Sequence, residues 1–146
     1  YFHDKKRSTA LICLCSILNI LLPDSQPNKN IYKSYEKFIE SINFDYWIIL
    51  YIYFELHLIK ELGYDTDLKR FQKNDLDSSE MVKIKIDTYT YEVPKFLVLN
   101  NIPKNLPNLL IKKSLYFTRN IIQNRFFIPN NLSFPKSRII LENYFN

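Results

Sequence analysis

The sequence predicts a mainly α-helical fold, a bundle of about five helices with one small β-hairpin inserted. Apolar residues recur at helical spacing through most of the 146 residues, which indicates amphipathic helices. Two short runs, residues 82–86 and 89–93, instead alternate apolar and polar residues as strands do, with a two-residue turn between them. The single glycine, Gly63, argues against a turn-rich all-β fold and against glycine-rich nucleotide-binding loops.

The first two helices follow from caps and periodicity. Ser8 or Thr9 can act as the N-cap of a first helix that runs to residue 22, where Pro23 ends it. A second helix is predicted over about residues 29–42, because apolar residues recur there at helical spacing: Ile31, Tyr35, Phe38, Ile39 and Ile42.

The third helix is predicted over residues 46–62, with Asp45 as its N-cap. It is apolar on most of its faces, so we expect it at the centre of the bundle. Gly63 follows its last periodic residue, where the chain reverses through a left-handed conformation that favours glycine. Glu55 lies on this apolar helix, and we expect a structural carboxylate paired with an Arg, Lys or Tyr.

The rest of the chain completes the bundle. Residues 64–80 are predicted to form a polar loop that leads into the hairpin. Apolar and polar residues alternate strictly in the first strand, which places Val82, Ile84 and Ile86 on one face. A long helix is expected over about residues 106–127, closed by Pro129. Ser133 or Pro135 begins a last short helix that runs to residue 145.

Several chemistries find no support in the sequence. Cys13 and Cys15 point in different directions on a helix, so we expect two small buried hydrophobic residues rather than a disulfide or metal pair. His57 and Glu61 share a helix face, but no third ligand accompanies them. No nucleophile–base arrangement, paired catalytic carboxylates or phosphate loop is visible, which argues against an enzyme.

Targeting signals are also missing from the sequence. The apolar run at residues 10–22 is shorter than the roughly 20 residues that a membrane-spanning helix needs. We therefore expect a cytoplasmic protein that does not enter a membrane. Because the chain begins at Tyr1 and reads directly into a helix, we expect it to be part of a longer protein.

The net charge of +5 is unevenly distributed. Residues 1–103 hold 13 Lys and Arg against 14 Asp and Glu, whereas residues 104–146 hold 7 against 1. This asymmetry suggests a polyanionic partner for the C-terminal part, although basic ends also occur for solubility alone.

The long helix separates into an apolar arc and a cationic arc when its residues are projected at helical spacing. The apolar arc holds Leu110, Ile111, Leu115, Phe117, Ile121, Ile122 and Phe126. The opposite arc holds Lys112, Lys113, Tyr116, Arg119, Asn120, Gln123 and Asn124. Cations with an interleaved aromatic suit phosphates and unstacked bases, but from the residues alone an ordinary solvated face is favoured. Arg125 projects into the apolar arc, so we expect it to snorkel or to pair with a buried carboxylate.

Four stretches carry a family resemblance: LLPDSQPNKNIYKSYEKFIESI, YFELHLIKELGYDTDL, VPKFL and YFTRNIIQNRFFIPNNLSFPKSRIIL. In this order they resemble the C-terminal helical region of RecO, the bacterial recombination mediator family, in its alphaproteobacterial form. The most specific is the second, which fits the pattern ELGY-x-x-DL and has Glu55 and Gly63 in or beside it.

The resemblance implies a non-enzymatic DNA repair and recombination mediator with an N-terminal OB-fold, which is missing from this chain. RecO-like proteins bind single- and double-stranded DNA, anneal complementary strands and partner with RecR. They also bind the acidic, Phe-ended tail of single-stranded-DNA-binding protein, and so assist RecA indirectly. A nucleoid-associated bacterial protein is therefore expected. The alternative is a helical protein–protein interaction domain with no specific nucleic-acid role.

The resemblance also implies that this version binds no zinc and no other cofactor. Many family members carry a four-cysteine zinc module directly after ELGY-x-x-DL, but here Phe71 stands where the first cysteine would fall. We expect a single domain: helices over residues 1–63, a loop and hairpin in the place of the zinc module over 64–103, and basic helices over 104–146. With the family in view, the candidates for binding DNA or the acidic tail are Lys112, Lys113, Tyr116, Arg119, Lys136 and Arg138.

Overall fold

A computed structural model describes residues 4–22, 28–73 and 80–146 of the chain. The described part is mainly α-helical with one antiparallel hairpin, as the sequence predicts. The elements in chain order are α1 (Lys5–Leu21), α2 (Lys29–Glu40), α3 (Trp47–Glu61), a 3₁₀ helix (Leu68–Lys73), β1 (Met81–Ile86), β2 (Tyr89–Pro94), α4 (Lys95–Leu99), α5 (Asn108–Ile122), a π turn (Gln123–Phe127), a 3₁₀ turn (Ile128–Asn130) and α6 (Lys136–Asn143).

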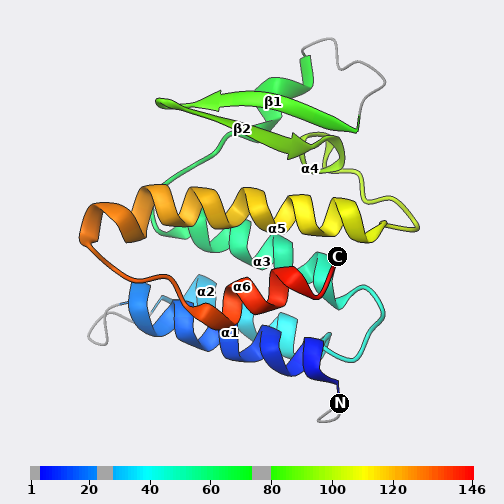
Figure 1. Ribbon diagram of the computed structural model, residues 1–146, viewed down its shortest axis with the longest axis vertical. Coiled ribbons are helices and arrows are strands. Elements are labelled where there is room, and N and C mark those ends of the chain that lie inside the picture. The colour runs from blue at the N-terminus through cyan, green and yellow to red at the C-terminus, as the bar shows by residue number, and fades with distance from the viewer. Residues whose placement is uncertain (1–3, 23–27, 74–79) are drawn as a thin grey trace.

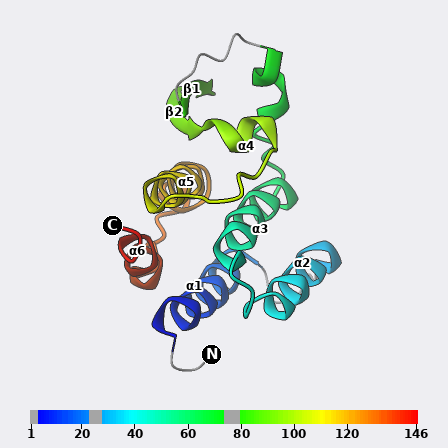
Figure 2. The ribbon, with the colours of Figure 1, turned by 90° about the vertical axis from the view of Figure 1, so that its right-hand side faces the viewer.

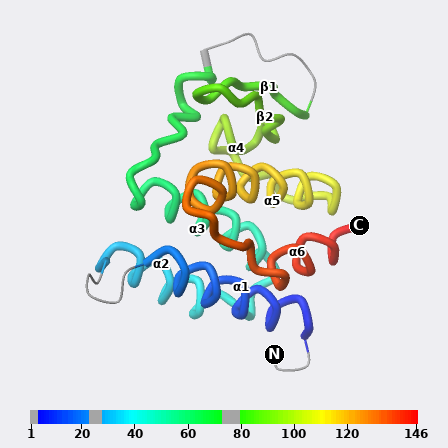
Figure 3. The backbone as a smooth tube through the Cα atoms, turned by 60° about the vertical axis from the view of Figure 1, so that its left-hand side comes forward, coloured from blue at the N-terminus to red at the C-terminus, as the bar shows by residue number. Residues whose placement is uncertain are grey.

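Helix α5 lies in the middle of the molecule, with the hairpin and α4 on one side and α6 on the other (Figures 1 and 2). Helix α3 packs beside α5 and also against α2, while α6 packs against α1. The last helix of the chain therefore lies beside the first, as the tube view also shows (Figure 3). This arrangement puts the beginning of α1 and the C-terminal residues at one end of the bundle (Figure 1).

Two predicted helix caps are wrong. Helix α1 is capped by Asp4, whose carboxylate accepts hydrogen bonds from the backbone N–H groups of Lys6 (3.0 Å) and Arg7 (3.3 Å), and so begins before Ser8. An aspartate at this position satisfies two backbone donors of the first turn. Asp45 makes no capping hydrogen bond, because α3 begins one residue later and Tyr46 takes the N-cap position. Pro23 lies outside the described residues.

The central position predicted for α3 is confirmed. Its buried side chains face more than one direction around the helix: Trp47, Ile48, Tyr51, Ile52, Phe54, Glu55, Leu58 and Ile59. Helix α2, in contrast, buries only Ile31 and Phe38 and presents its other faces to solvent. A helix surrounded by others needs apolar residues on most faces, whereas a peripheral one needs a single stripe.

Gly63 ends α3 as predicted, with a φ of +93°. The Tyr64 N–H donates to the Ile59 carbonyl (3.1 Å) and the Gly63 N–H donates to the Lys60 carbonyl (2.9 Å). This pair of bonds is the Schellman motif, which satisfies carbonyls that the helix end would leave unpaired. At the four other positive-φ positions of the described residues the chain uses Asp67, Asp87, Asn100 and Asn131, the residue types that tolerate this conformation best.

The hairpin has the predicted strands and turn, with Ile84 opposite Tyr91 and Ile86 opposite Tyr89. Ile84, Ile86, Tyr91 and Val93 are buried. The ring of Tyr91 meets Phe117 of α5 edge-on, with 5.7 Å between the centroids. The sequence missed two short helical elements beside it. The 3₁₀ helix lies in the predicted polar loop, and α4 directly follows β2.

Helix α5 does not continue regularly to Phe127 as predicted, because its last turn is a π turn. The extra residue in such a turn rotates the side chains that follow it. Arg125 consequently leaves the apolar arc and is exposed, with its guanidinium 4.8 Å from the centroid of the Tyr64 ring. The expectation that Arg125 pairs with a buried carboxylate is therefore wrong.

Candidate functional site

A buried ion-pair network joins α3, α5 and α6. Arg138 is 0% exposed and binds both oxygens of Glu55, from Nε to Oε2 (2.7 Å) and from Nη2 to Oε1 (2.8 Å). The Tyr51 hydroxyl (2.8 Å) and the Thr118 hydroxyl (2.6 Å) also donate to this carboxylate. The opposite charge and the additional donors compensate for the loss of water around Glu55, which is 1% exposed. The predicted structural role of Glu55 is confirmed.

The second half of the network lies nearer the surface. Arg119 of α5 binds both oxygens of Glu142, at 2.8 Å and 3.1 Å, and its remaining amino group donates to Gln123. Arg138 reaches the same Glu142 at 3.3 Å. Two arginines therefore share two carboxylates, and their charges largely cancel inside the bundle.

This network corrects one predicted site residue. Arg138 was expected on a binding surface, but it has no accessible area and all its polar groups bond inside the protein. The reason is the tertiary contact with Glu55, which lies 83 residues away in sequence. The side chain of Arg119 is 18% exposed, but both oxygens of Glu142 already bind its guanidinium group.

The other predicted site residues remain accessible and fall into separate places. Tyr116 is 52% exposed, and with Lys113 it lines a groove between α5 and β2. Lys112 is half-buried and donates to the side chain of Asn146 at the C-terminus. Lys136 is exposed at the first turn of α6. Whether these residues bind a ligand stays a prediction.

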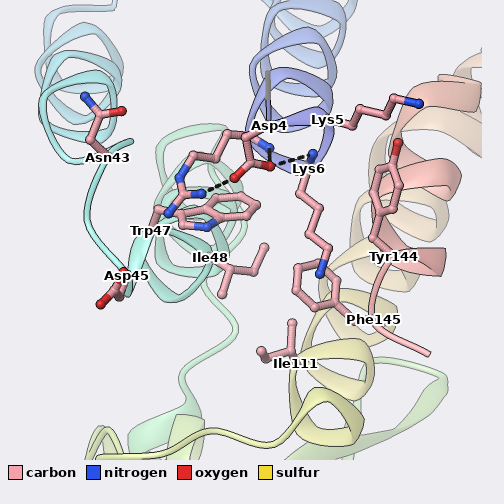
Figure 4. A pocket seen from close by; sticks show the side chains of 11 residues that line it. Asp4, Lys5, Lys6, Asn43, Asp45, Trp47, Ile48, Ile111, Tyr144 and Phe145 are labelled. Carbon is pink, nitrogen blue, oxygen red and sulfur yellow. Dashed lines mark hydrogen bonds and ion pairs between the residues drawn. The ribbon is translucent and has the colours of Figure 1, made fainter. Parts of the chain in front are cut away.

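The structure adds a cleft of about 940 Å³ that the sequence did not indicate. Its apolar walls come from α3, α5 and the C-terminus and consist of Trp47, Ile48, Ile111 and Phe145 (Figure 4). Asn43 and Asp45 line it from the turn before α3, and Tyr144 precedes Phe145. The four apolar side chains are each between 5% and 6% exposed. The floor of the cleft is therefore apolar, but only a small part of each of these side chains reaches solvent.

Three consecutive cations, Lys5, Lys6 and Arg7, stand at the rim of this cleft. The ammonium group of Lys6 lies over the Phe145 ring (Figure 4), 5.2 Å from its centre. The Arg7 guanidinium lies 5.5 Å from the centre of the Trp47 ring. Arg7 is held by an ion pair with Asp4 and by a hydrogen bond from Nε to the Ile42 carbonyl (2.7 Å). Lys5 and Lys6 are exposed, and no carboxylate of the described residues pairs with either.

Electrostatics at the rim are set by the Asp4–Arg7 pair. Partial burial raises the pKa of Asp4, but hydrogen bonds and the charge of Arg7 outweigh it and leave the pKa below the usual 3.8. Asp4 therefore stays ionised at neutral pH and neutralises Arg7. The charge left for a ligand comes from Lys5 and Lys6.

The sequence contains almost no local pattern that could predict this cleft. The run Lys5-Lys6-Arg7 was the only local signal, and a short basic run at the start of a helix is common. The apolar walls combine residues 47–48, 111 and 145, which only the packing of α1 against α6 and α3 against α5 brings together.

The remaining candidates give no site. His57 Nδ1 lies 2.6 Å from the Ser34 hydroxyl and its Nε2 lies 3.3 Å from Glu61, which links α2 to α3. Within residues 4–22, 28–73 and 80–146, no group of three His, Cys, Asp or Glu side chains is placed to hold a metal ion. In the same part of the chain, no helix is long and apolar enough to cross a membrane.

The two cysteines differ, against the expectation that both are buried. Cys13 is buried, whereas Cys15 is exposed. Burial raises the pKa of the Cys13 thiol to about 11. The difference arises because residues two apart on a helix point to different faces.

Together these features define a helical module with a hairpin on one side and an apolar cleft, rimmed by lysines, at one end. The chain belongs to the family described as "Recombination protein O C terminal", whose model matches residues 3–80. That range covers α1 to α3 and the 3₁₀ helix and ends before the hairpin.

Curated relatives agree with this family. The chain is 33% identical over 72 residues to a "DNA repair protein RecO" of Wolbachia pipientis subsp. Culex pipiens, covering 48% of this chain and 30% of the relative. It is 33% identical over 81 residues to the protein of the same name from Ehrlichia chaffeensis, covering 54% and 33%. The matches thus span about a third of each relative. No solved structure matches the chain significantly.

Proposed function

We propose that this chain acts in DNA repair and recombination as a mediator that works by binding alone. Family membership and relatives named "DNA repair protein RecO" support the general role. The finer proposal is that it binds DNA and the acidic, Phe-ended tail of single-stranded-DNA-binding protein. Association with RecR and indirect assistance to RecA belong to the same proposal, as does the prediction that no zinc is needed.

The cleft at the end of the bundle is the observation that carries the tail proposal. A terminal Phe ring needs an apolar contact, and its candidate is the floor of the cleft, where Trp47 and Phe145 are each 5% exposed. The carboxylates of an acidic tail need cations, and Lys5 and Lys6 at the rim have no carboxylate partner among the described residues. The volume of about 940 Å³ lies within the range of ligand sites, about 300–1,000 Å³. Lys112, beside the C-terminal Asn146, adds a cation next to the Phe145 wall.

The only tryptophan of the chain gives a direct test, because Trp47 lines this cleft. An acidic peptide that ends in Phe and lacks Trp would be titrated into the 146-residue chain while Trp emission is recorded. Fluorescence anisotropy of the labelled peptide would give the affinity. We expect a saturable change in Trp emission, and about tenfold weaker binding of a peptide without the terminal Phe, since burying such a ring contributes about 1.5–3 kcal/mol.

Charge variants sharpen the test. Reversing both rim lysines, Lys5→Glu with Lys6→Glu, should weaken tail binding by about tenfold, because each exposed pair contributes up to about 1 kcal/mol. The matched control is Lys29→Glu with Lys33→Glu, which reverses two exposed lysines of α2 that do not line the cleft. Binding that ignores the terminal Phe and is weakened equally by both double variants would contradict the proposal. That result would favour a general cationic surface or the protein–protein interaction alternative.

A further inference from the structure

The groove between β2 and α5 is a second concave surface, separate from the cleft. It measures about 330 Å³. Lys113, Tyr116 and Asn120 line it from α5, while Thr90 and Glu92 line it from β2. The edge-on contact of Tyr91 with Phe117 closes its base and holds the strand against the helix.

The aromatic ring of the groove is held in place from behind. The Arg119 guanidinium lies 4.8 Å from the centre of the Tyr116 ring, and Arg119 is itself fixed by both oxygens of Glu142. Tyr116 is nevertheless 52% exposed. A ring that is supported on one face and open elsewhere loses little conformational entropy when a flat ligand stacks on it.

Three polar side chains of the groove have no partner within the part of the chain that the structure describes. Neighbouring polar residues of α5 are engaged: Arg119 binds Glu142, and Asn124 donates to the Tyr91 hydroxyl (3.2 Å). The side chains of Lys113, Asn120 and Glu92, in contrast, make neither a hydrogen bond nor an ion pair to a described residue. A cation, an amide and a carboxylate are thus available around one aromatic ring.

We propose that this groove holds one unstacked nucleobase of single-stranded DNA, and that it favours a base with an exocyclic amino group. Tyr116 stacks on the base, as aromatic side chains do in single-strand binding sites. Glu92 accepts a hydrogen bond from the amino group, as carboxylates do with cytosine, and the Asn120 amide bonds the same edge. Lys113 binds a neighbouring phosphate.

The groove excludes a paired duplex by the same chemistry. In double-stranded DNA the faces of a base are stacked and its pairing edge is occupied, so Tyr116 and Asn120 could reach neither without extruding the base. The inference rests on the DNA-binding part of the proposed function and deepens it by assigning a strand state and a base class to one site.

Binding of labelled dC and dT homo-oligomers to the 146-residue chain tests this inference. Salt of about 0.2 M suppresses the nonspecific phosphate contribution. We expect dC to bind about fivefold more tightly than dT, the effect of one net hydrogen bond. Tyr116→Ala should weaken dC binding by about tenfold, since stacking on one aromatic contributes that much or more. Tyr116→Phe should retain it. Tyr32→Ala, which removes a tyrosine of 53% exposure on α2, is the matched control and should change nothing.

Glu92→Gln separates base reading from overall charge. The variant removes a negative charge and so strengthens binding to both oligomers, but the preference for dC over dT should fall toward one. Equal affinities of the unmodified chain for dC and dT would overturn the proposed role of the groove in base binding. Equal losses of dC affinity in Tyr116→Ala and Tyr32→Ala would do the same. Neither result would affect the proposals of DNA binding in general or of tail binding in the cleft. Absence of binding to both DNA and the tail peptide would overturn the proposed function as well.

Discussion

The arginines of the buried network and the lysines of the surface carry the same charge in very different surroundings. Arg138 and Arg119 face Glu55 and Glu142 across α3, α5 and α6, and their charges are satisfied inside the protein. Lys5 and Lys6 at the cleft, and Lys113 in the β2–α5 groove, have no carboxylate partner among the described residues. The first group holds the bundle together, and the second supplies the cations of the two proposed binding sites.

This difference shows why counting charges does not locate a binding surface. Residues 104–146 hold 7 basic residues and a single acidic one, and that one, Glu142, pairs with Arg119 and Arg138. Burying a cation requires a carboxylate partner, whereas a solvated lysine requires none. Arg119 and Arg138, with their planar guanidinium groups, occupy the paired positions, whereas Arg125 and the lysines of this segment have no carboxylate partner among the described residues.

Removing the buried arginine is expected to have the largest effect. Arg138→Met leaves Glu55 buried without its cation, which should reduce the free energy of unfolding by about 3–5 kcal/mol. Chemical denaturation monitored by circular dichroism measures the change. Adding Glu55→Leu to Arg138→Met should restore much of the loss, because no uncompensated charge then remains. A single variant as stable as the parent would contradict the network.

The partly exposed arginine should matter less for stability. Arg119→Ala breaks the two bonds to Glu142, but Arg138 still contacts that carboxylate and solvent reaches the site. We expect a loss of about 1–2 kcal/mol, between the values for surface and buried pairs. The same denaturation measurement applies. A loss as large as that of Arg138→Met would mean that the two halves of the network act as one unit.

Surface lysines should leave stability nearly unchanged. Lys113→Ala, alone or with Lys6→Ala, should shift the free energy of unfolding by less than about 0.5 kcal/mol. The effect of Lys113→Ala alone should appear only in DNA binding, as a shallower salt dependence. If Lys113→Ala instead destabilises the protein as much as Arg119→Ala, the division into structural arginines and free lysines fails.

The two cysteines of α1 allow a comparison of a buried and an exposed side chain without altering the fold. At pH 8 a thiol reagent should modify the exposed Cys15 promptly. Cys13 should react only as the protein opens, because it is 0% exposed and its thiol pKa is raised to about 11. Thiol titration before and after unfolding measures both, and Cys15→Ser should remove the fast reaction. Equal rates for the two thiols would contradict the packing of α1 against α6.

Stability should also fall in alkali. The pKa of Cys13 is raised above its unfolded value of 9.0, so between about pH 9 and pH 11 the unfolded chain loses a proton that the folded chain keeps. The contribution of this group is therefore complete below pH 9 and decreases above it. Cys13→Ala should reduce the slope of stability against pH in that window, measured by denaturation at several pH values.

Much of the fold could be predicted from local pattern. The spacing of apolar residues located the helices, strict alternation located both strands, and Gly63 located the end of α3. The burial and pairing of Glu55 followed from a carboxylate on an apolar helix. The caps were less predictable, because Ser8, Thr9 and Asp45 are all acceptable caps by residue type. In the folded backbone Asp4 is the residue placed to cap α1, and no side chain is placed to cap α3.

The sequence by itself determined the helical class, the hairpin, the glycine-terminated central helix and the family resemblance, since each depends on residues close together in the chain. Only the tertiary structure decided which cations are paired with carboxylates and where the concave surfaces of the molecule lie. Arg138 is buried because α6 folds back onto α3. The cleft exists because Lys6, near the start of the chain, meets Phe145 at its end. Burial and charge pairing are properties of long-range packing, and local sequence patterns cannot specify them.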